Sequence, residues 1–356
     1  MTRRLKTFRE RLASPVGLPK TGELRSDKEV AEAYQHGFEG VIYDPDAADE
    51  LASETSAAGL EPIAAAAVDR FGLAETGKGK LTLLYPEVWK AFGNSDFYPG
   101  IPRQQCGDCV SHSLKHSLLA SLSCAVNNGT GSVPKVTEAG LKCGGFHPSP
   151  TYWLRHHAGD GWSCAESVRQ ATGHIGIAVC QEYGDPLNFD LTQYSASVAH
   201  KWGRSPPPEN IQQQLGGHKV VTSTRCSSFE EIRDLLAAGY GITTCGGEGW
   251  SSERDSNGVS RRRGHWSHAL CYLGADDTDW AHKNYGGPLI LITNSWGKSW
   301  NSGPRAIHGD KSLGEIPDGC FWTRWEDCSR RDCYAISSVH GWPNQKLKDW
   351  NLRGLI

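Results

Sequence analysis

The chain has 356 residues, enough for one large two-lobed domain with an extension or for two ordinary domains. Hydrophobic residues make up 38% and aromatic residues 9%, a globular composition that excludes a wholly disordered chain. The formal net charge of -3 gives no reason to expect nucleic acid or an anionic membrane as a partner. Because no run approaches the roughly 20 apolar residues of a bilayer span, we expect no membrane anchor.

The first part of the chain, residues 1–80, is predicted to be a small α/β extension. Its basic arm, residues 1–25, is typical of a solvated tail more than of a nucleic-acid contact. An extension of this size is a marginal folding unit, so its apolar faces need the rest of the protein or a partner. Capping, turn and strand signals predict a helix over residues 26–37, a strand over 38–43 and a helix over 45–59.

The clearest helical pattern runs over residues 109–126, where apolar residues recur with a period of 3.6 and predict a helix buried along one face. After it the pattern changes, and the second half of the chain becomes richer in strands. A proline-rich stretch over residues 204–210 indicates the crossing between the two halves. The other predicted elements are a helix over 227–238 and strands over 269–273 and 289–293.

Cys109 stands where the loop Cys106-Gly107-Asp108 gives way to the predicted helix. A thiol attacks a carbonyl well only as the thiolate, which the positive end of a helix or a nearby imidazolium favours. A single Cys at a helix end is more often a small buried hydrophobe, so its interpretation depends on other residues. Far downstream, His268 begins an apolar strand and Asn294 begins the run Asn-Ser-Trp-Gly.

These three segments, in this order, resemble the papain family of cysteine peptidases, whose signature is Cys-Gly-Ser/Ala-Cys-Trp/Tyr with His and Asn far downstream. Two more segments resemble the bacterial branch of that family. Residues 148–154 resemble its Ser-Pro-x-Tyr-Leu-Tyr helix start, and Gly161-Trp162-Ser163 resembles its Gly-Gly wall of the S2 pocket. The resemblance covers about residues 86–340. It implies an α+β papain-like fold with a helical left lobe and a β-barrel-like right lobe.

The resemblance divides the chain into the extension and a catalytic domain over residues 81–345. The helical lobe is expected over about residues 109–205 and the strand-rich lobe over about 206–345. The N-terminal extension lacks the charged and aromatic pattern of the family's propeptides. We therefore expect residues 1–80 to be a permanent accessory segment, packed on the catalytic domain or on a larger protein assembly.

By resemblance, Cys109 is the nucleophile, His268 its base and Asn294 the residue that orients the base. The expected reaction is hydrolysis of a peptide bond through a thioester, with a protein or peptide as substrate. Trp296 is expected to shield the bond between His268 and Asn294 from water. A Trp in the S2 wall predicts a preference for a small or flat P2 side chain. The residues expected to bind substrate are Gly161, Trp162 and Ser267.

The oxyanion hole is the main departure from the family pattern. The family places a Gln six residues before the nucleophile, but Arg103 occupies that position here. Gln104 would take the role if the loop were one residue shorter, and Gln105 is the alternative. Since one oxyanion donor is worth roughly 10²–10³ in rate, this difference bears directly on activity.

Three other histidines compete for the role of base. His112 and His116 lie on the nucleophile's own helix, whereas the base is expected from the other lobe, so we interpret both as bystanders. His265 is close to His268 but lacks the Ala-Leu strand that follows His268.

The chain has twelve cysteines, and without an export signal or a regular spacing we expect mostly reduced thiols. The resemblance implies a disulfide between Cys106 and Cys143 that supports the active-site loop. Apart from Cys106 and Cys109 no closely spaced Cys-x-x-Cys pair exists, which argues against zinc. No metal and no cofactor are therefore expected.

Two alternatives to an active endopeptidase or exopeptidase remain open. The altered oxyanion region and the unfamiliar extension favour a papain-fold structural or adaptor component of a larger assembly, such as a virus particle. A cysteine amidase or transferase acting on cell-wall peptides would use the same triad. The basic start is not followed by an apolar segment, so no signal peptide is expected, and the protein is expected to be cytoplasmic or virion-associated.

Overall fold

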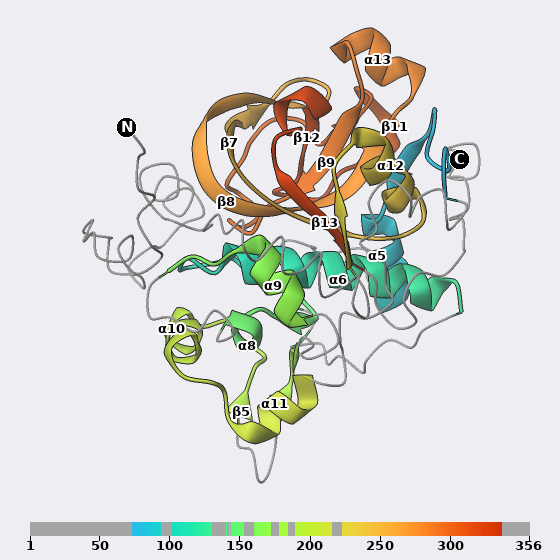
Figure 1. Cartoon of the computed structure of the whole chain (residues 1–356). Helices are drawn as coiled ribbons and strands as arrows, with labels where there is room; N and C mark the ends of the chain where they lie inside the picture. Colours follow the sequence, from blue (N-terminus) through green and yellow to red (C-terminus); the bar gives the residue numbers. More distant parts are fainter. Residues whose placement is uncertain are drawn as a thin grey trace, which may run out of the picture.

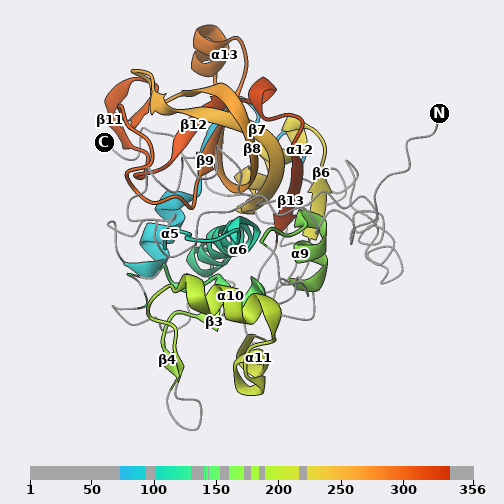
Figure 2. The ribbon, with the colours of Figure 1, turned by 90° about the vertical axis from the view of Figure 1, so that its left-hand side faces the viewer.

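The fold places one long helix, α6 (Cys109–Asn127), between a lobe of helices and a lobe of strands (Figure 1). In Figure 2 this helix is seen along its axis, with the sheet on one side and α10 and α11 on the other. The two-lobed α+β fold expected from the sequence is thus confirmed. The computed structural model describes residues 73–93, 102–129, 140, 142, 144–152, 160–171, 178–183, 189–215 and 223–336. The elements predicted over residues 26–59 lie outside the described residues.

The strand lobe is a seven-stranded antiparallel sheet with the order β12-β9-β8-β7-β13-β6, and β1 pairs with β8 beside this path. The long hairpin of β7 and β8 curls the sheet into a barrel-like shape (Figure 1). Its strands are β1 (Leu81–Leu83), β6 (Ser223–Cys226), β7 (Ile242–Arg254), β8 (Ser260–Asp276), β9 (Leu289–Thr293), β12 (Phe321–Arg324) and β13 (Asp332–Ile336).

Several short elements of the strand lobe lie outside its seven-stranded sheet. The predicted helix over residues 227–238 is confirmed as α12 (Phe229–Ala237), which begins with a capping box between Ser228 and Glu231. Helix α5 (Tyr85–Phe92) packs against α6, with a proline in its first turn and Gly93 at its end. The others are α13 (Asp279–Tyr285), the 3-10 helix η2 (Trp325–Asp327) and the hairpin β10 (Ala306–Ile307) and β11 (Asp310–Glu315).

The described residues of the helical lobe form four further helices and two short strand pairs. Its last helix, α11, corrects the predicted crossing at residues 204–210. The proline run there starts α11, and Ile211 packs with Trp202 in the helical lobe, so the chain leaves this lobe later than predicted. The elements are β2 (Phe146–His147), α8 (Ser149–Tyr152), α9 (Cys164–Ala171), β3 (Ala178–Val179), β4 (Glu182–Tyr183), β5 (Phe189–Asp190), α10 (Ala196–Arg204) and α11 (Glu209–Leu215).

Helix α6 is buried on every side, whereas the sequence predicted one buried face. The reason is a row of serines spaced four residues apart, which a hydrophobic pattern does not detect. Ser113 Oγ lies 2.5 Å from Thr243 Oγ1, Ser117 Oγ bonds Cys271 Sγ at 3.2 Å, and Ser121 Oγ donates to Ile336 O at 2.6 Å. These small polar side chains satisfy buried groups of the sheet and let it approach the helix closely.

The chain of the strand lobe approaches helix α6 closely at Gly241, directly before β7. A Cβ atom at this position would lie 2.4 Å from Ser117 O. Because this oxygen belongs to the backbone of α6, it cannot shift without moving the helix. The amide of Gly241 also donates to Ser121 Oγ at 2.9 Å. A glycine is therefore required where the two lobes meet.

Replacing Gly241 by Ala should lower the free energy of unfolding by about 1–3 kcal/mol, because the added methyl overpacks the interface between α6 and β7. Urea unfolding measures this difference. Gly287→Ala is the matched control, since a Cβ at Gly287 would have nothing within 4 Å. Unchanged stability in Gly241→Ala would show that helix and sheet are not in close contact.

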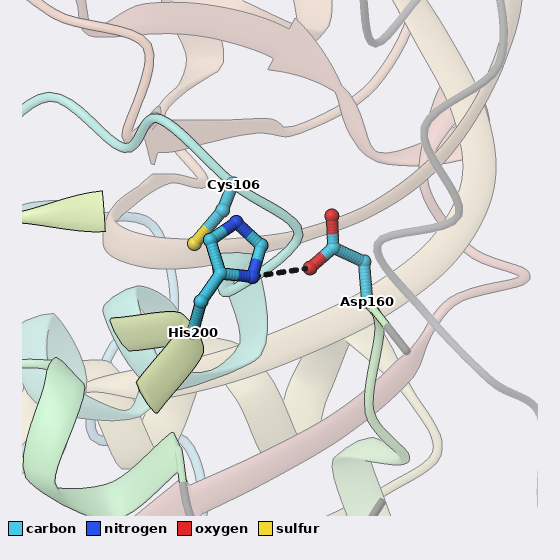
Figure 3. A group of neighbouring side chains, drawn as sticks. All are labelled: Cys106, Asp160 and His200. Carbon is cyan, nitrogen blue, oxygen red and sulfur yellow. Dashed lines mark ion pairs between the residues drawn. The ribbon is translucent and has the colours of Figure 1, made fainter. Parts of the chain in front are cut away.

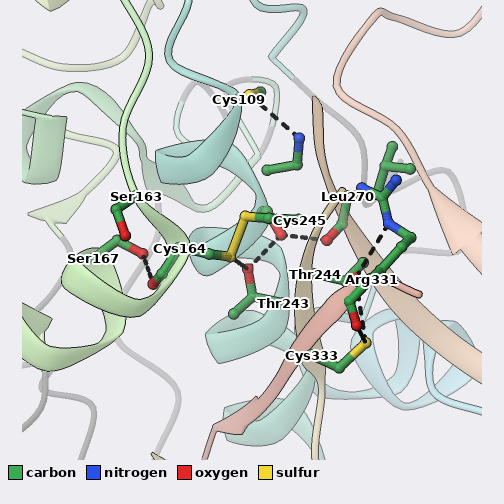
Figure 4. The surroundings of a disulfide bond; sticks show 12 residues. Cys109, Ser163, Cys164, Ser167, Thr243, Thr244, Cys245, Leu270, Arg331 and Cys333 are labelled. Carbon is green, nitrogen blue, oxygen red and sulfur yellow. Dashed lines mark hydrogen bonds between the residues drawn. A yellow bond between two sulfur atoms is a disulfide. The ribbon is translucent and has the colours of Figure 1, made fainter. Parts of the chain in front are cut away.

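A disulfide also joins the two lobes. Cys164, the first residue of α9, is bonded to Cys245 in β7 (Figure 4). The sequence predicted mostly reduced thiols and gave no sign of this pair, because its members are 81 residues apart. Cys143 lies outside the described residues, so its pairing with Cys106 stays a prediction. No helix among the described residues is long and apolar enough to cross a bilayer.

Candidate active site

The Cys109 thiol lies at the boundary between the lobes. Cys109 is the first residue of α6, so its side chain faces the positive end of the helix dipole. The backbone amide of Ala269, in β8, donates to Cys109 Sγ at 3.4 Å (Figure 4). The side chain is fully buried. A strand of one lobe thus contacts the sulfur at the start of the main helix of the other.

Antiparallel pairing brings His268 and Asn294 together. Strand β8 pairs with β9 with Cys271 opposite Thr293; Asn294 directly follows Thr293, and His268 lies three residues before Cys271. His268 Nε2 lies 2.8 Å from Asn294 Oδ1. His268 directly precedes Ala269, whose backbone amide contacts Cys109 Sγ, so the backbone of His268 adjoins the residue that holds the thiol. His268 and Asn294 are paired, and the action of all three residues as a triad stays a prediction.

The hydrogen bonds around Asn294 fix which imidazole nitrogen carries the proton. Ser295 N donates to Asn294 Oδ1 at 2.7 Å, which orients the amide with its oxygen toward His268. An amide oxygen only accepts, so His268 Nε2 must be the donor. In the neutral ring Nδ1 then holds the lone pair and can accept a proton from a thiol.

Trp296 stacks on the His268 ring, with ring centroids 4.6 Å apart and planes 27° from parallel. Trp296 is fully buried and belongs to an aromatic cluster of the strand lobe. The cluster covers one face of the imidazole, and the shielding role of Trp296 stays a prediction. Its other members are Trp250, Trp266, Trp300 and Phe321.

The two candidate oxyanion residues occupy different positions. Gln104 is fully buried, and its backbone amide nitrogen donates to the backbone oxygen of Ser295, the residue after Asn294, at 2.8 Å. Its side chain contacts Ser295 Oγ and donates from Nε2 to Cys106 O at 3.0 Å. Gln105 is half-buried, and its backbone amide donates to the Tyr194 hydroxyl at 3.2 Å. The site therefore contains Gln104, and Gln105 packs against the helical lobe.

The segment predicted to line the substrate pocket, Gly161 and Trp162, lies against the loop that precedes Cys109. Gly161 N donates to Gly107 O at 3.1 Å, and the positive φ of 85° at Gly161 suits a glycine. Trp162 is only 2% exposed and packs in the buried cluster that also contains Cys109. Ser267 is half-buried, directly before His268. Gly161 and Trp162 are thus both buried, while Ser267 is partly exposed.

Burial sets the charge state of the resting pair. It raises the pKa of the Cys109 thiol to about 12, against the opposing hydrogen bond from Ala269. It lowers the pKa of His268 to about 3, although the hydrogen bond to Asn294 raises it. With the lobes closed, the pair is a neutral thiol and a neutral imidazole. Formation of an ion pair requires water or substrate to reach the site.

Asp108 adds a negative charge beside the nucleophile, where the family signature has Ser or Ala. Asp108 is fully buried and accepts a hydrogen bond from the Tyr194 hydroxyl at 2.9 Å. After burial, its charge is among the causes that raise the pKa of the Cys109 thiol. This residue therefore opposes thiolate formation.

Asp108→Asn should lower the pKa of Cys109, because it removes the charge while keeping an acceptor for Tyr194. We expect the pH profile of Cys109 alkylation by iodoacetamide to move to lower pH, with a severalfold faster rate at neutral pH. Asp279→Asn, on exposed helix α13, is the control and should leave the profile unchanged. A profile that moves to higher pH would contradict this role.

Arg331 is a residue that the sequence gave no reason to choose. It is buried, and its Nη2 donates to the backbone oxygen of His268 at 2.5 Å. Glu248 Oε2, at 3.4 Å, and the ring of Trp250 hold the guanidinium in place. Its charge lowers the pKa of both Cys109 and His268, which favours thiolate and disfavours imidazolium. No local motif marks Arg331, because it reaches the site only through the pairing of β13 with β7.

The competing histidines lie elsewhere. His265 is exposed, and His112 and His116 are buried in α6, with His112 Nε2 3.6 Å from Asp108 Oδ1. His147 is also buried; its Nδ1 accepts from Ser149 N at 3.2 Å. Burial lowers the pKa of His112 and His116, and that of His147 to about 4. The fold keeps these buried rings neutral.

Stability should therefore fall as the pH falls below about 6.5. The unfolded chain binds protons at its histidines near that pH, whereas the folded chain binds them only at lower pH, so acid favours unfolding. For His147 alone the loss between pH 7 and 5 is about 2 kcal/mol, measurable by urea unfolding. His147→Gln should show a weaker pH dependence. Stability that is constant or higher at pH 5 would contradict neutral burial.

Comparison with known proteins gives matches only among solved structures. No known protein family and no curated protein sequence matches the chain. Xylellain, a cysteine protease from Xylella fastidiosa, has a TM-score of 0.45 at 15% identity over 73% of this chain and 86% of its own. Procathepsin B S9 from Trypanosoma congolense has a TM-score of 0.40 at 14% identity, over 71% of this chain and 76% of its own. Bromelain from Ananas comosus has a TM-score of 0.40 at 11% identity, over 70% of this chain and 96% of its own. Likenesses this loose carry no argument about function, which rests on the site itself.

Proposed function

We propose that the chain is a papain-like cysteine peptidase that hydrolyses peptide bonds of a protein or peptide substrate. The observation that carries this proposal is the hydrogen bond from His268 Nε2 to Asn294 Oδ1, at 2.8 Å, beside a thiol held by the next backbone amide. An imidazole oriented by an amide and attached to the chain segment that contacts a thiol supports thiol catalysis.

The proposed reaction uses the two neutral groups as partners. His268 Nδ1 takes the Cys109 proton, and Sγ attacks the carbonyl carbon of the substrate. The carbon–nitrogen bond breaks, His268 returns the proton to the leaving amine, and a thioester remains on Cys109. Water, deprotonated by His268, then attacks the thioester and releases the acid and the thiol. Asn294 holds the ring through both steps.

Gln104 is the proposed side-chain donor to the oxyanion. Its Nε2 carries two protons, of which one points to Cys106 O. Its links to Ser295 hold it beside Asn294, at the same end of α6 as the thiol. A donor fixed before the reaction stabilises the developing charge without reorganisation.

A second function, a structural or adaptor component, is favoured by one observation. Cys109 and His268 are both fully buried, and burial disfavours the charge on each. An inactive papain fold would keep such a closed, neutral pair. Labelling of the intact protein with iodoacetamide at neutral pH separates the two functions, since only an activated Cys109 reacts fast relative to a simple thiol such as glutathione.

Cys109→Ala and His268→Ala should each reduce hydrolysis of denatured casein by about 10³-fold or more, because they remove nucleophile and base. Asn294→Ala should reduce it less, since Asn294 acts through His268. Initial rates with a fluorescent casein measure these losses.

The control for these variants is His265→Ala, which removes an exposed histidine three positions from the proposed base and should keep wild-type turnover. Thermal unfolding should show that all four variants remain folded. Wild-type turnover in Cys109→Ala or His268→Ala would disprove the assignment.

A further inference from the structure

Three side chains that can bind a metal meet in the helical lobe, at one edge of the candidate active site. Cys106 comes from the loop before α6, Asp160 from the segment before α9 and His200 from α10 (Figure 3). Their ligand atoms, Sγ, a carboxylate oxygen and a ring nitrogen, all lie within 4.8 Å of one another. His200 Nδ1 lies 3.7 Å from Asp160 Oδ1.

These separations are close to those around a zinc ion. Zinc bonds of about 2.3 Å to sulfur and about 2.0–2.2 Å to nitrogen or oxygen put tetrahedral ligand atoms about 3.5 Å apart. The pair of His200 and Asp160, at 3.7 Å, is close to this value, and Cys106 Sγ lies within 4.8 Å of both. A mixed set of thiolate, imidazole and carboxylate suits zinc better than calcium or magnesium, which prefer oxygen ligands.

The surroundings support the ligands. The Tyr152 hydroxyl shares its proton between Gly107 O at 2.9 Å and Asp160 Oδ1 at 3.3 Å, and the Tyr194 hydroxyl, which donates to Asp108, lies 3.5 Å from Cys106 Sγ. Such outer hydrogen bonds orient metal ligands in zinc proteins. Cys106 is fully buried, whereas the His200 side chain is 28% exposed, which gives an ion a path from solvent.

We propose that Cys106, Asp160 and His200 form a binding site for a zinc-type divalent cation, with water as the fourth ligand, and that this site takes the place of the disulfide expected between Cys106 and Cys143. The Cys106 thiol loses its proton to solvent when the sulfur–metal bond forms, and no redox change takes place. Spacing along the sequence gave no sign of this site, since its three residues come from separate segments.

The ion would clamp the nucleophile's loop to the predicted substrate wall. A Cβ on Gly107 would lie 2.4 Å from Asp160 Cβ, and Gly161 N bonds Gly107 O at 3.1 Å, so the two segments are already in contact. Cys106 is three residues before Cys109, and Asp160 directly precedes Gly161. The clamp's effect on catalysis rests on the proposed function, but the metal site itself does not.

The test uses the full chain with Cys109→Ala, which removes the candidate catalytic thiol as a competing ligand and makes the readout independent of activity. Titration with Co²⁺ should produce one equivalent of the absorption band that marks a thiolate bound to cobalt, and Zn²⁺ should displace it. Zinc at about 100 times its Kd should also raise the melting temperature by about 5 °C or more.

Adding Cys106→Ser or His200→Ala should abolish the cobalt–thiolate band. His282→Ala is the control, because His282 is also paired with an acid, Asp277 at 2.9 Å, on the far side of the strand lobe from α10, and should keep the band. A band that persists in Cys106→Ser, or no band in folded Cys109→Ala, would overturn the site. Peptide mapping under non-reducing conditions that finds Cys106 joined to Cys143 would overturn it as well.

Discussion

The structure depends on the burial of α6 between two lobes that differ in kind. A helix with a single apolar face could cover only one lobe. Here the serines at positions 113, 117 and 121 contact the sheet, while apolar residues face the helices, so both lobes close on the same helix. Gly241 allows the sheet to come within backbone contact of α6. This fixed spacing determines where the first residue of the helix, Cys109, meets β8.

The same closure shapes the chemistry of the site. Excluding water strengthens the hydrogen bond from His268 to Asn294, but it also removes the solvation that a thiolate and an imidazolium need. Fixed charges then act at short range: Arg331 favours the thiolate, and Asp108 opposes it. The balance between these two buried groups, together with the access of water to the site, sets how readily the pair ionises.

Sequence patterns predicted the elements that follow local rules. The start of α6 at Cys109, the bounds of β9 and the presence of helix α12 follow from periodicity and turn chemistry, and His268 and Asn294 stand in a recognisable order. What the sequence did not reveal are contacts between distant segments that carry no motif. The hydrogen bond from Arg331 to the backbone oxygen of His268 and the disulfide from Cys164 to Cys245 both result from tertiary packing alone.

The central claim is that Cys109 and His268, from opposite lobes, act together as nucleophile and base. The most direct measurement is acid-quench mass spectrometry of the protein mixed with a p-nitrophenyl ester of an acylated amino acid. The account predicts one acyl group on the peptide that contains Cys109 in the wild type, and none in His268→Ala. An acyl group on a different cysteine, or equal acylation of Cys109 without His268, would contradict it.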